Sequence, residues 1–361
     1  MQEIVELTQD LIRFRSMHSN PQKILECAGF IESYLHQNDI AYRRVDRNGI
    51  PSILALPNEK FVPVLLMSHI DVVDAPDSLF EPRIADGKLY GRGSIDDKYA
   101  VALSLVLIKE YLTRLRSQGK DQLDLPFGIL ITGDEEVGGH NGAQKALEEI
   151  DPEFCIALDG GRVDKVVLKE KGLLTLKLVC HGKAAHGARP WLGENAIEKL
   201  FNDYIVMKNL FKETAKGHWH RTLNLSLIRA GKSFNQVPDR AEATFDIRYT
   251  ENDDVDRLYE QLQAAVSGNL QVLAREPMFN SGECPYLTLL LEVSDTIHAG
   301  IEHGASDARF VSDYGICGVV WGADGDNSQH TRDEHVNIDS LFALYGLLDK
   351  FIRKVETVNY C

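Results

Sequence analysis

The sequence predicts an α/β protein: a mainly parallel, mixed sheet with helices on both faces, interrupted by an inserted ferredoxin-like α+β domain. Two observations lead to this fold class. Short, uniformly apolar segments alternate with helical stretches in the first half of the chain, which is typical of strands buried on both faces. From Gly172 onward the strand candidates alternate apolar and polar residues instead, so a second kind of sheet is expected there.

The main domain is expected to begin with a helix, because Ile4, Leu7, Leu11 and Phe14 recur at helical spacing. The elements expected after it are strands at 52–56, 63–67, 127–132 and 154–158, with helices at 98–115 and 142–150. Ligands of such sheets gather at the carboxyl ends of the strands.

The second pattern follows the order βαββαβ, which indicates a compact ferredoxin-like module. Its expected elements are strands at 174–178, 223–227, 243–248 and 270–274, with helices at 194–211 and 254–266. After Pro285 the first pattern resumes, with a helix at 286–299, a strand at 316–321 and a helix at 340–355. The predicted domains are therefore residues 1–171 with 283–361, and the insert 172–282.

Composition narrows the class of protein. The chain has 361 residues and a net charge of -15, which argues against a nucleic-acid or anionic-membrane partner. The amino terminus has no basic region leading into an apolar stretch, and no apolar run approaches the ~20 residues of a membrane span. We expect a soluble, cytoplasmic protein. Its six cysteines show no CxxC spacing and are interpreted as reduced, packed thiols: Cys27, Cys155, Cys180, Cys284, Cys317 and Cys361.

Histidines and carboxylates follow the apolar strands directly. His69 follows the run 65–67, Glu135 and Glu136 follow 130–132, and Asp159 follows 156–158. Asp71 lies two residues after His69, so it can hold one imidazole nitrogen while the other nitrogen binds a metal. A lone histidine or an acidic pair is more often structural or solvated. The repetition of the pattern at several strand ends favours a shared site.

Two further ligand candidates lie in glycine-bounded loops. Asp96, in the segment 91–98, is interpreted as a carboxylate that bridges two metals, with Asp97 supporting the loop; the alternative is a helix cap. His330 lies in the segment 325–332 and is expected to return to the main domain after the insert. Because Glu135 and Glu136 are adjacent and point in different directions, one can bind metal while the other reaches a water molecule.

Two histidines and three carboxylates suit a pair of divalent ions, and a further carboxylate could activate water, which indicates a hydrolase. Imidazole and carboxylate ligands without thiolate favour zinc, with cobalt or manganese as alternatives. The chain has no HExxH helix, so a metal site must be assembled from distant segments, and the lack of a phosphate-binding glycine loop weakens a nucleotide-binding alternative. A calcium loop starting at Asp324 fails, because Gln329 and His335 occupy its sixth and twelfth positions.

Together these segments resemble the co-catalytic zinc aminoacylase and carboxypeptidase family, which includes acetylornithine deacetylase, succinyl-diaminopimelate desuccinylase, bacterial glutamate carboxypeptidase and several dipeptidases. The resemblance covers nearly the whole chain. It implies that Asp96 joins two ions, that Glu135 is the general base and then the general acid, and that the peptide bond between Asp96 and Asp97 is cis. The implied ligands are His69, Asp96 and Asp159 for one ion and Asp96, Glu136 and His330 for the other, with Asp71 orienting His69.

The same resemblance assigns roles in the insert, which would be a lid and dimerisation domain. His186 is similar to the lid histidine that stabilises the oxyanion, and in dimeric relatives that histidine comes from the opposite subunit. Asn235 and Arg248 match substrate-binding lid elements, with Arg248 suited to a bidentate grip on a carboxylate. Ser306 lies in a segment that resembles the substrate-facing loop of the main domain. The resemblance therefore implies a homodimer.

The expected activity is metal-dependent hydrolysis of a short peptide or an N-acyl amino acid. Asp159 favours peptide hydrolysis, since aspartate at this position resembles aminopeptidases and dipeptidases, whereas the modest insert is more like the deacylases. A deacylase, such as a desuccinylase or deacetylase, therefore stays open as an alternative. A catalytically inactive binding relative is the alternative from another class, although no ligand or base is missing here.

Overall fold

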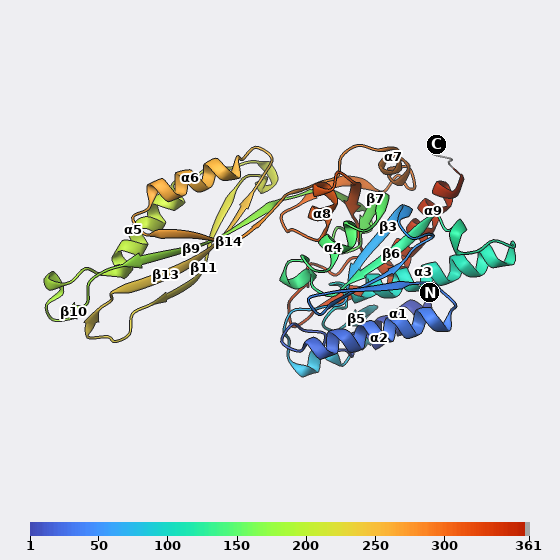
Figure 1. Ribbon diagram of the computed structural model, residues 1–361, viewed down its shortest axis with the longest axis horizontal. Coiled ribbons are helices and arrows are strands. Elements are labelled where there is room, and N and C mark those ends of the chain that lie inside the picture. The colour runs from blue at the N-terminus through green and yellow to red at the C-terminus, as the bar shows by residue number, and fades with distance from the viewer. Residues whose placement is uncertain (358–361) are drawn as a thin grey trace. The chain divides into compact units, whose positions relative to one another are not determined.

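The computed structural model describes residues 1–357, which divide into two compact units (Figure 1). Unit 1 comprises residues 1–169, 279–302 and those from 306 onward, and unit 2 comprises 170–278 and 303–305. The sequence placed these boundaries after residues 171 and 282. Within residues 1–357 no helix is long and apolar enough to cross a membrane.

Unit 1 is built on a nine-stranded mixed sheet in the order β1-β2-β6-β3-β7-β17-β8-β15, with β16 also pairing to β8. Its central strands β6, β3, β7 and β17 run parallel, whereas β1, β2 and β8 pair antiparallel to their neighbours. The predicted α/β class with a mainly parallel, mixed sheet is confirmed. The strands are β1 (Arg43–Arg47), β2 (Ile50–Ala55), β3 (Phe61–His69), β6 (Phe127–Thr132), β7 (Asp151–Ala157), β8 (Lys165–Glu170), β15 (Phe279–Asn280), β16 (His298–Glu302) and β17 (Cys317–Val320).

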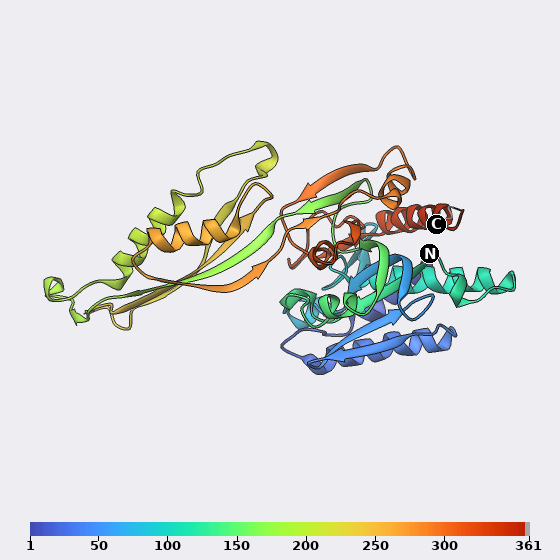
Figure 2. The same cartoon turned by 45° about the horizontal axis from the view of Figure 1, so that its top comes forward.

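Alternating side chains of each central strand enter two separate cores. In β3, Val64 and Leu66 pack on one face of the sheet, while Leu65 and Met67 pack on the other. Helices α1, α2, α3, α7 and α9 contribute to the first core, and α4 and α8 to the second (Figures 1 and 2). The helices are α1 (Gln2–Ile12), α2 (Pro21–Gln37), α3 (Lys98–Ser117), α4 (Ala143–Leu147), α7 (Pro285–Leu291), α8 (Ala308–Asp313) and α9 (Ile338–Thr357).

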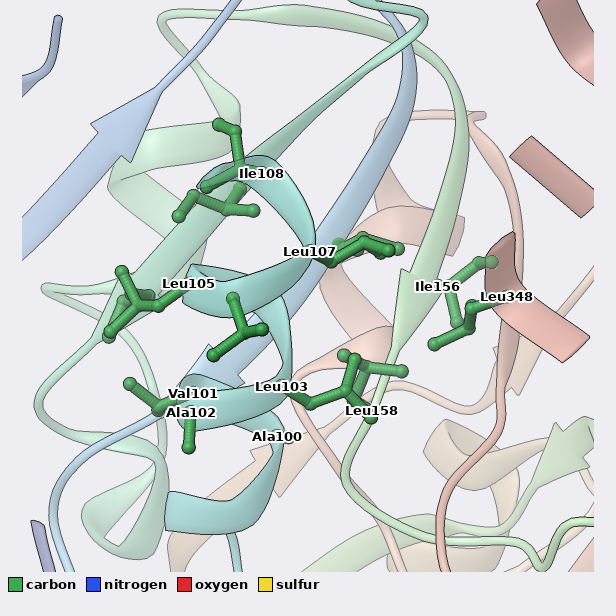
Figure 3. Packing of buried hydrophobic residues seen from close by; sticks show 14 of the residues in the cluster. Ala100, Val101, Ala102, Leu103, Leu105, Leu107, Ile108, Ile156, Leu158 and Leu348 are labelled. Carbon is green, nitrogen blue, oxygen red and sulfur yellow. The ribbon is translucent and has the colours of Figure 1, made fainter. Parts of the chain in front are cut away.

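Helix α3 is the centre of the larger core. Its residues from Lys98 to Ile108 are all buried, so this part of the helix is enclosed on every side rather than along one stripe. Figure 3 shows Leu103 and Leu107 of this helix near Ile156 and Leu158, which lie on and just after β7. The helix thereby fixes the segment that precedes it, which carries Asp96.

A small antiparallel sheet in unit 1 has the order β18-β5-β4 and connects distant parts of the chain. His335 of β18 (His335–Asn337) pairs with Tyr90 of β5 (Lys88–Tyr90), and β5 also pairs with β4 (Arg83–Ala85). The segment with Asp96 follows β5, and the segment with His330 precedes β18. This pairing therefore brings the two segments to one place.

Unit 2 has the predicted βαββαβ order, and its four-stranded antiparallel sheet has the ferredoxin-like order β11-β13-β9-β14. Side chains such as Leu176 and Phe245 face the core formed with the two helices, which lie on one face of the strands (Figure 2). The elements are β9 (Gly172–His181), α5 (Ala196–Lys208), β11 (Thr222–Ala230), β13 (Arg240–Tyr249), α6 (Val255–Ala265) and β14 (Asn269–Glu276), with a two-stranded ribbon of β10 (Ala185–His186) and β12 (Gln236–Val237).

Two predictions about unit 1 are wrong. The helix expected at 286–299 ends at Leu291, and His298–Glu302 forms a strand. Between them, the Ser294 hydroxyl accepts the backbone N–H of Thr296, the kind of local side-chain bond that competes with a helix.

The second error concerns the cysteines. Cys284 and Cys317 form a disulfide, because α7 packs against β17 and brings the two side chains together. Cys27, Cys155 and Cys180 are buried free thiols, as predicted, and Cys361 lies outside the described residues.

Candidate metal centre

The carboxyl ends of three neighbouring parallel strands supply most of the candidate ligands. His69 is the last residue of β3, the Glu135-Glu136 turn follows β6, and Asp159 follows β7. β3 pairs with both β6 and β7 in parallel, so these ends lie at one edge of the sheet. The site is therefore a direct product of the sheet topology.

Two groups of potential metal ligands meet at this edge, and they share one residue. His69, Asp96 and Asp159 form the first group, and Asp96, Glu136 and His330 form the second. Within each group the ligand atoms lie within 4.8 Å of one another. All five side chains that the sequence singled out as ligands thus meet in space, although they come from segments up to 261 residues apart (residues 69 and 330).

Asp96 directs its two oxygens toward different histidines. Its Oδ1 lies 3.1 Å from His69 Nε2, and its Oδ2 lies 2.9 Å from His330 Nε2. His69 Nε2 is also 3.8 Å from Asp159 Oδ2, and His330 Nε2 is 3.3 Å from Glu136 Oε2. A carboxylate placed in this way could offer one oxygen to each ligand group.

The hydrogen bonding of His69 indicates that the first ligand group can bind a divalent cation. His69 Nε2 is buried and makes no hydrogen bond with any described residue, despite its distance of 3.1 Å from Asp96. Its other nitrogen, Nδ1, lies 3.0 Å from the backbone oxygen of Asp71 and is thus held as a donor. Nε2 then carries a lone pair aimed at two carboxylates, which is what a metal ligand requires.

The charge distribution around the site favours a cation. Burial lowers the pKa of His69, but the neighbouring Asp71 and Asp96 outweigh burial and raise that pKa well above its ordinary value. Hydrogen bonds to Asp96 and Glu136 raise the pKa of His330 to about 10. Acidic side chains that raise the pKa of both histidines would also stabilise a divalent cation between them.

The residue after Asp96 supports the loop rather than capping the helix. The peptide bond between Asp96 and Asp97 is cis, as the resemblance implied. Asp97 precedes α3 but makes no capping hydrogen bond with the described helix; its Oδ2 instead accepts the backbone N–H of His69 at 3.4 Å. Burial raises the pKa of Asp97 well above its ordinary value, with the charge of Asp159 adding to the effect.

Asp71 has a wider structural role than the sequence indicated. Its carboxylate lies 3.4 Å from His69 Nδ1, but it also accepts the backbone N–H groups of Glu135 at 3.2 Å and Glu136 at 2.9 Å. His18 donates a further hydrogen bond to it at 2.9 Å. Despite burial, these bonds lower the pKa of Asp71 to about 2. Asp71 therefore fixes the glutamate turn as well as His69.

Glu135 and Glu136 point to different partners, as expected for adjacent residues. Glu136 Oε1 accepts the N–H of Val73 at 3.2 Å, while its Oε2 faces His330. Glu135 lies outside both ligand groups and lines a small cavity with His69, Asp159 and Asp307. Burial raises the pKa of Glu135 well above its ordinary value, and the charge of Asp159 raises it further. Such a carboxyl can take and return a proton.

Comparison with known proteins decides the family. Residues 65–354 match the Peptidase family M20/M25/M40, which is more than half of the chain. The chain belongs to this family. It is 27% identical to a succinyl-diaminopimelate desuccinylase from Wolbachia pipientis, over 97% of this chain and 92% of that protein.

Solved structures show the same fold in both units. A tripeptidase from Staphylococcus aureus matches with a TM-score of 0.80 at 20% identity, covering 99% of each chain. An M20 family metallo-carboxypeptidase from Sulfolobus solfataricus also has a TM-score of 0.80 at 20% identity, covering 99% of this chain and all of that one. As an M20/M25/M40 peptidase, the protein is a hydrolase of peptide or amide bonds that uses divalent metal ions.

Sequence reasoning about this M20 enzyme missed several residues that hold the site. His18 lies alone in a polar segment, so no pattern pointed to it. Arg309 is buried and donates to the backbone oxygens of Ser306 at 2.6 Å and Gly138 at 2.8 Å, which joins the segment at 306 to the turn after Glu136. Arg309 lies close to Ser306 in the same sequence segment, and this proximity was the signal that could have pointed to Arg309. Ser306 itself is buried, and its hydroxyl accepts the N–H of Ala308.

The predicted lid residues all lie in unit 2. His186 is exposed on β10 and pairs with Gln236 of β12, next to Asn235, whose backbone oxygen accepts the N–H of Gly187. Arg248 grips Asp246, two residues away on the same strand, with Nε–Oδ1 at 2.9 Å and Nη2–Oδ2 at 3.1 Å. The bidentate grip predicted for a substrate carboxylate is thus made here to the chain's own aspartate.

Proposed function

We propose that the enzyme binds two divalent ions, zinc in preference to cobalt or manganese, and hydrolyses a short peptide or an N-acyl amino acid. One ion would be held by His69, Asp96 and Asp159, and the other by Asp96, Glu136 and His330. The observation that carries the proposal is the position of Asp96 between two histidines, with one oxygen directed at each. The three ligand carboxylates nearly balance two divalent charges, which suits a neutral amide substrate.

Bound at these points, two divalent ions would acidify a water molecule and polarise the scissile carbonyl. Glu135 is placed to accept the proton of the attacking water, because it lines the cavity beside His69 and Asp159 without belonging to either ligand group. Its raised pKa suits the later step, in which Glu135 donates that proton to the leaving amine. Asp71 keeps the Glu135 backbone in place during both steps.

The proposed substrate residues come from the lid and the Ser306 segment. His186 Nδ1 accepts the N–H of Ala188 at 3.0 Å, which leaves the ring proton on Nε2 as a donor for an oxyanion. Asn235 lies on the same ribbon. Arg248 can grip a substrate carboxylate if that group replaces Asp246, and this competition would select substrates with a terminal carboxylate.

The test is turnover on a panel of dipeptides, tripeptides and N-acyl amino acids, with metal content measured on the same samples. We expect hydrolysis that stops with excess chelator and returns with zinc. Hydrolysis that continues at zero metal content would refute the metal centre. An intact metal centre with no turnover on any amide would favour a binding protein.

A deacylase is the second candidate function, and the desuccinylase relative favours it because it aligns with nearly the whole chain. The same panel separates the two, since a desuccinylase would cleave N-succinyl amino acids and leave unmodified dipeptides intact. Asp159 supports the peptidase alternative only through resemblance.

We further propose a homodimer formed through unit 2. Phe201 and Ile205 are exposed and lie one helical turn apart on α5. Leu227 and Ile228 are exposed on β11, one of the two edge strands of the four-stranded sheet. Sedimentation of the wild type and of Ile205→Glu tests this, with a monomeric wild type as the contradicting result.

A cytoplasmic location is also a proposal. The three buried thiols suit a reducing compartment, whereas the Cys284–Cys317 disulfide is typical of an oxidising one. Cell fractionation combined with thiol labelling of Cys284 decides between them.

A further inference from the structure

The loop that carries His330 lies in an unfavourable backbone conformation. Three of its non-glycine residues have positive φ: Asp326 at 56°, Asn327 at 56° and His330 at 62°. His330 itself is half exposed, and residues 325–334 contain no helix or strand. The Thr331 N–H and hydroxyl both donate to the backbone oxygen of Ser328 and shape the turn. The position of the imidazole next to Asp96 depends in addition on contacts with other segments.

A buried ion pair supplies those contacts. Glu334 is 1% exposed; its Oε2 pairs with Arg92 Nη1, and its Oε1 accepts the backbone N–H of Gly93 at 2.7 Å. Arg92 Nη2 also reaches the backbone oxygen of Thr331 at 3.5 Å. In the backbone, the N–H of Gly91 donates to the oxygen of Glu334 at 3.0 Å. Two side chains thus fasten the segment 91–93 to the segment 331–334.

The two fastened segments each carry one ligand of the second group. Asp96 lies four residues after Arg92, and His330 lies four residues before Glu334. The two segments are also closely packed: a Cβ at Gly325 would lie only 2.6 Å from Ile95 Cγ1 and 2.5 Å from the backbone oxygen of His335. This packing opposes sliding of one segment along the other. The separation of 2.9 Å between His330 Nε2 and Asp96 Oδ2 follows from this arrangement.

The first ligand group shares Asp96 with the second, but its other two ligands are held independently of the pair. His69 ends a central strand, Asp159 follows another, and the backbone N–H of His69 donates to Asp97. We infer that Arg92 and Glu334 are a positioning pair that sets the affinity of the enzyme for its second metal ion, the one held by His330. This inference rests on the proposed dinuclear centre.

A positioning role differs from a purely structural one in its consequences. Replacing both members of a buried ion pair by apolar residues of similar volume is often neutral or stabilising for a fold. The double substitution Arg92→Met/Glu334→Met should therefore leave the melting temperature of the metal-free protein near that of the wild type. It should nevertheless loosen the His330 loop, since the acceptor for Gly93 N–H and the donor to Thr331 are both lost.

The experiment is a titration of metal-free protein with cobalt(II), followed by calorimetry and by cobalt absorption. We expect two ions in the wild type. In the double variant the first ion should bind as in the wild type, and the second should bind about 10- to 100-fold more weakly, the range typical when residues that orient metal ligands are lost. Arg114→Met is the control, because it breaks the Arg114–Glu356 pair at 2.5 Å, which lies between α3 and α9.

The outcomes separate this inference from the proposed function. A wild type that binds one ion or none refutes the dinuclear centre. A wild type that binds two ions, together with a folded double variant that binds both with unchanged affinity, refutes the positioning role alone. Equal weakening of both ions also overturns it. If the double variant does not fold, Glu334→Gln carries the same test, since its amide oxygen still accepts the N–H of Gly93 while the negative charge is gone.

Discussion

Replacing Glu135 by glutamine removes the proposed proton carrier while changing little else. Glutamine has nearly the same volume, and the backbone N–H that Asp71 accepts is unaffected. Glu135 belongs to neither ligand group, so both ions should remain. The glutamine amide can neither take the proton from water nor donate it to the leaving amine.

The expected loss follows from that single function. A positioned general acid or base typically contributes 10²–10⁴-fold in rate, so kcat should fall by about that factor, equivalent to about 3–5 kcal/mol in the barrier. KM should change little, because substrate binding does not require the proton transfer. The assay is steady-state hydrolysis of the best substrate from the panel, with zinc content measured by elemental analysis.

A matched control is Glu148→Gln, at a surface glutamate that pairs with Lys145 and lies outside both ligand groups. Its kcat should equal that of the wild type. Normal turnover by Glu135→Gln would refute the assigned role. A variant that loses activity together with its metal would show that Glu135 acts as a ligand instead.

Three other substitutions probe the site and its support. Asp96→Asn should lower metal content at both positions, because each Asp96 oxygen faces a different histidine. His330→Ala should remove one ion only. Elemental analysis measures the metal content, and equal ion loss in both variants would contradict the bridging role. Phe127→Ala should lower the free energy of unfolding in denaturant by about 3–5 kcal/mol, since this buried ring leaves a cavity in the core; a loss below 1 kcal/mol would show that the core refills it. Burial raises the pKa of Asp307 to about 6, so the folded state keeps a proton that the unfolded chain releases near pH 4, and stability should fall as pH rises between these values. Asp307→Asn should flatten this fall in the metal-free protein by about 3 kcal/mol, and an unchanged pH profile would contradict the assignment.

The sequence predicts the parts of the site that follow from strand order. His69, Glu136 and Asp159 come directly after apolar strands, and parallel neighbouring strands necessarily end at the same edge. The βαββαβ insert was predictable for a similar reason, because strand alternation such as Leu174, Leu176 and Leu178 is a local signal. These features need no knowledge of distant contacts.

Other features depend on contacts that local patterns do not encode. The meeting of Asp96 and His330 relies on β5 and β18, each three residues long and too short to show periodicity. The Cys284–Cys317 disulfide depends on where α7 docks, which spacing cannot reveal. His18 reaches Asp71 only through the tertiary fold. For Asp96 and His330 the family resemblance, rather than periodicity, supplied the pairing.

The place of β17 in the large sheet has a consequence for folding of the protein during its synthesis on the ribosome. This strand lies between β7 and β8, yet it is made about 150 residues after them. Unit 2 is nearly continuous in the chain and can fold as it emerges, whereas β8 has no neighbour linking it to β7 until translation passes residue 320. His330 emerges later still. A ribosome-bound chain that ends before this point would have an incomplete sheet and an incomplete second ligand group. The enzyme is therefore expected to be inactive until synthesis is almost finished.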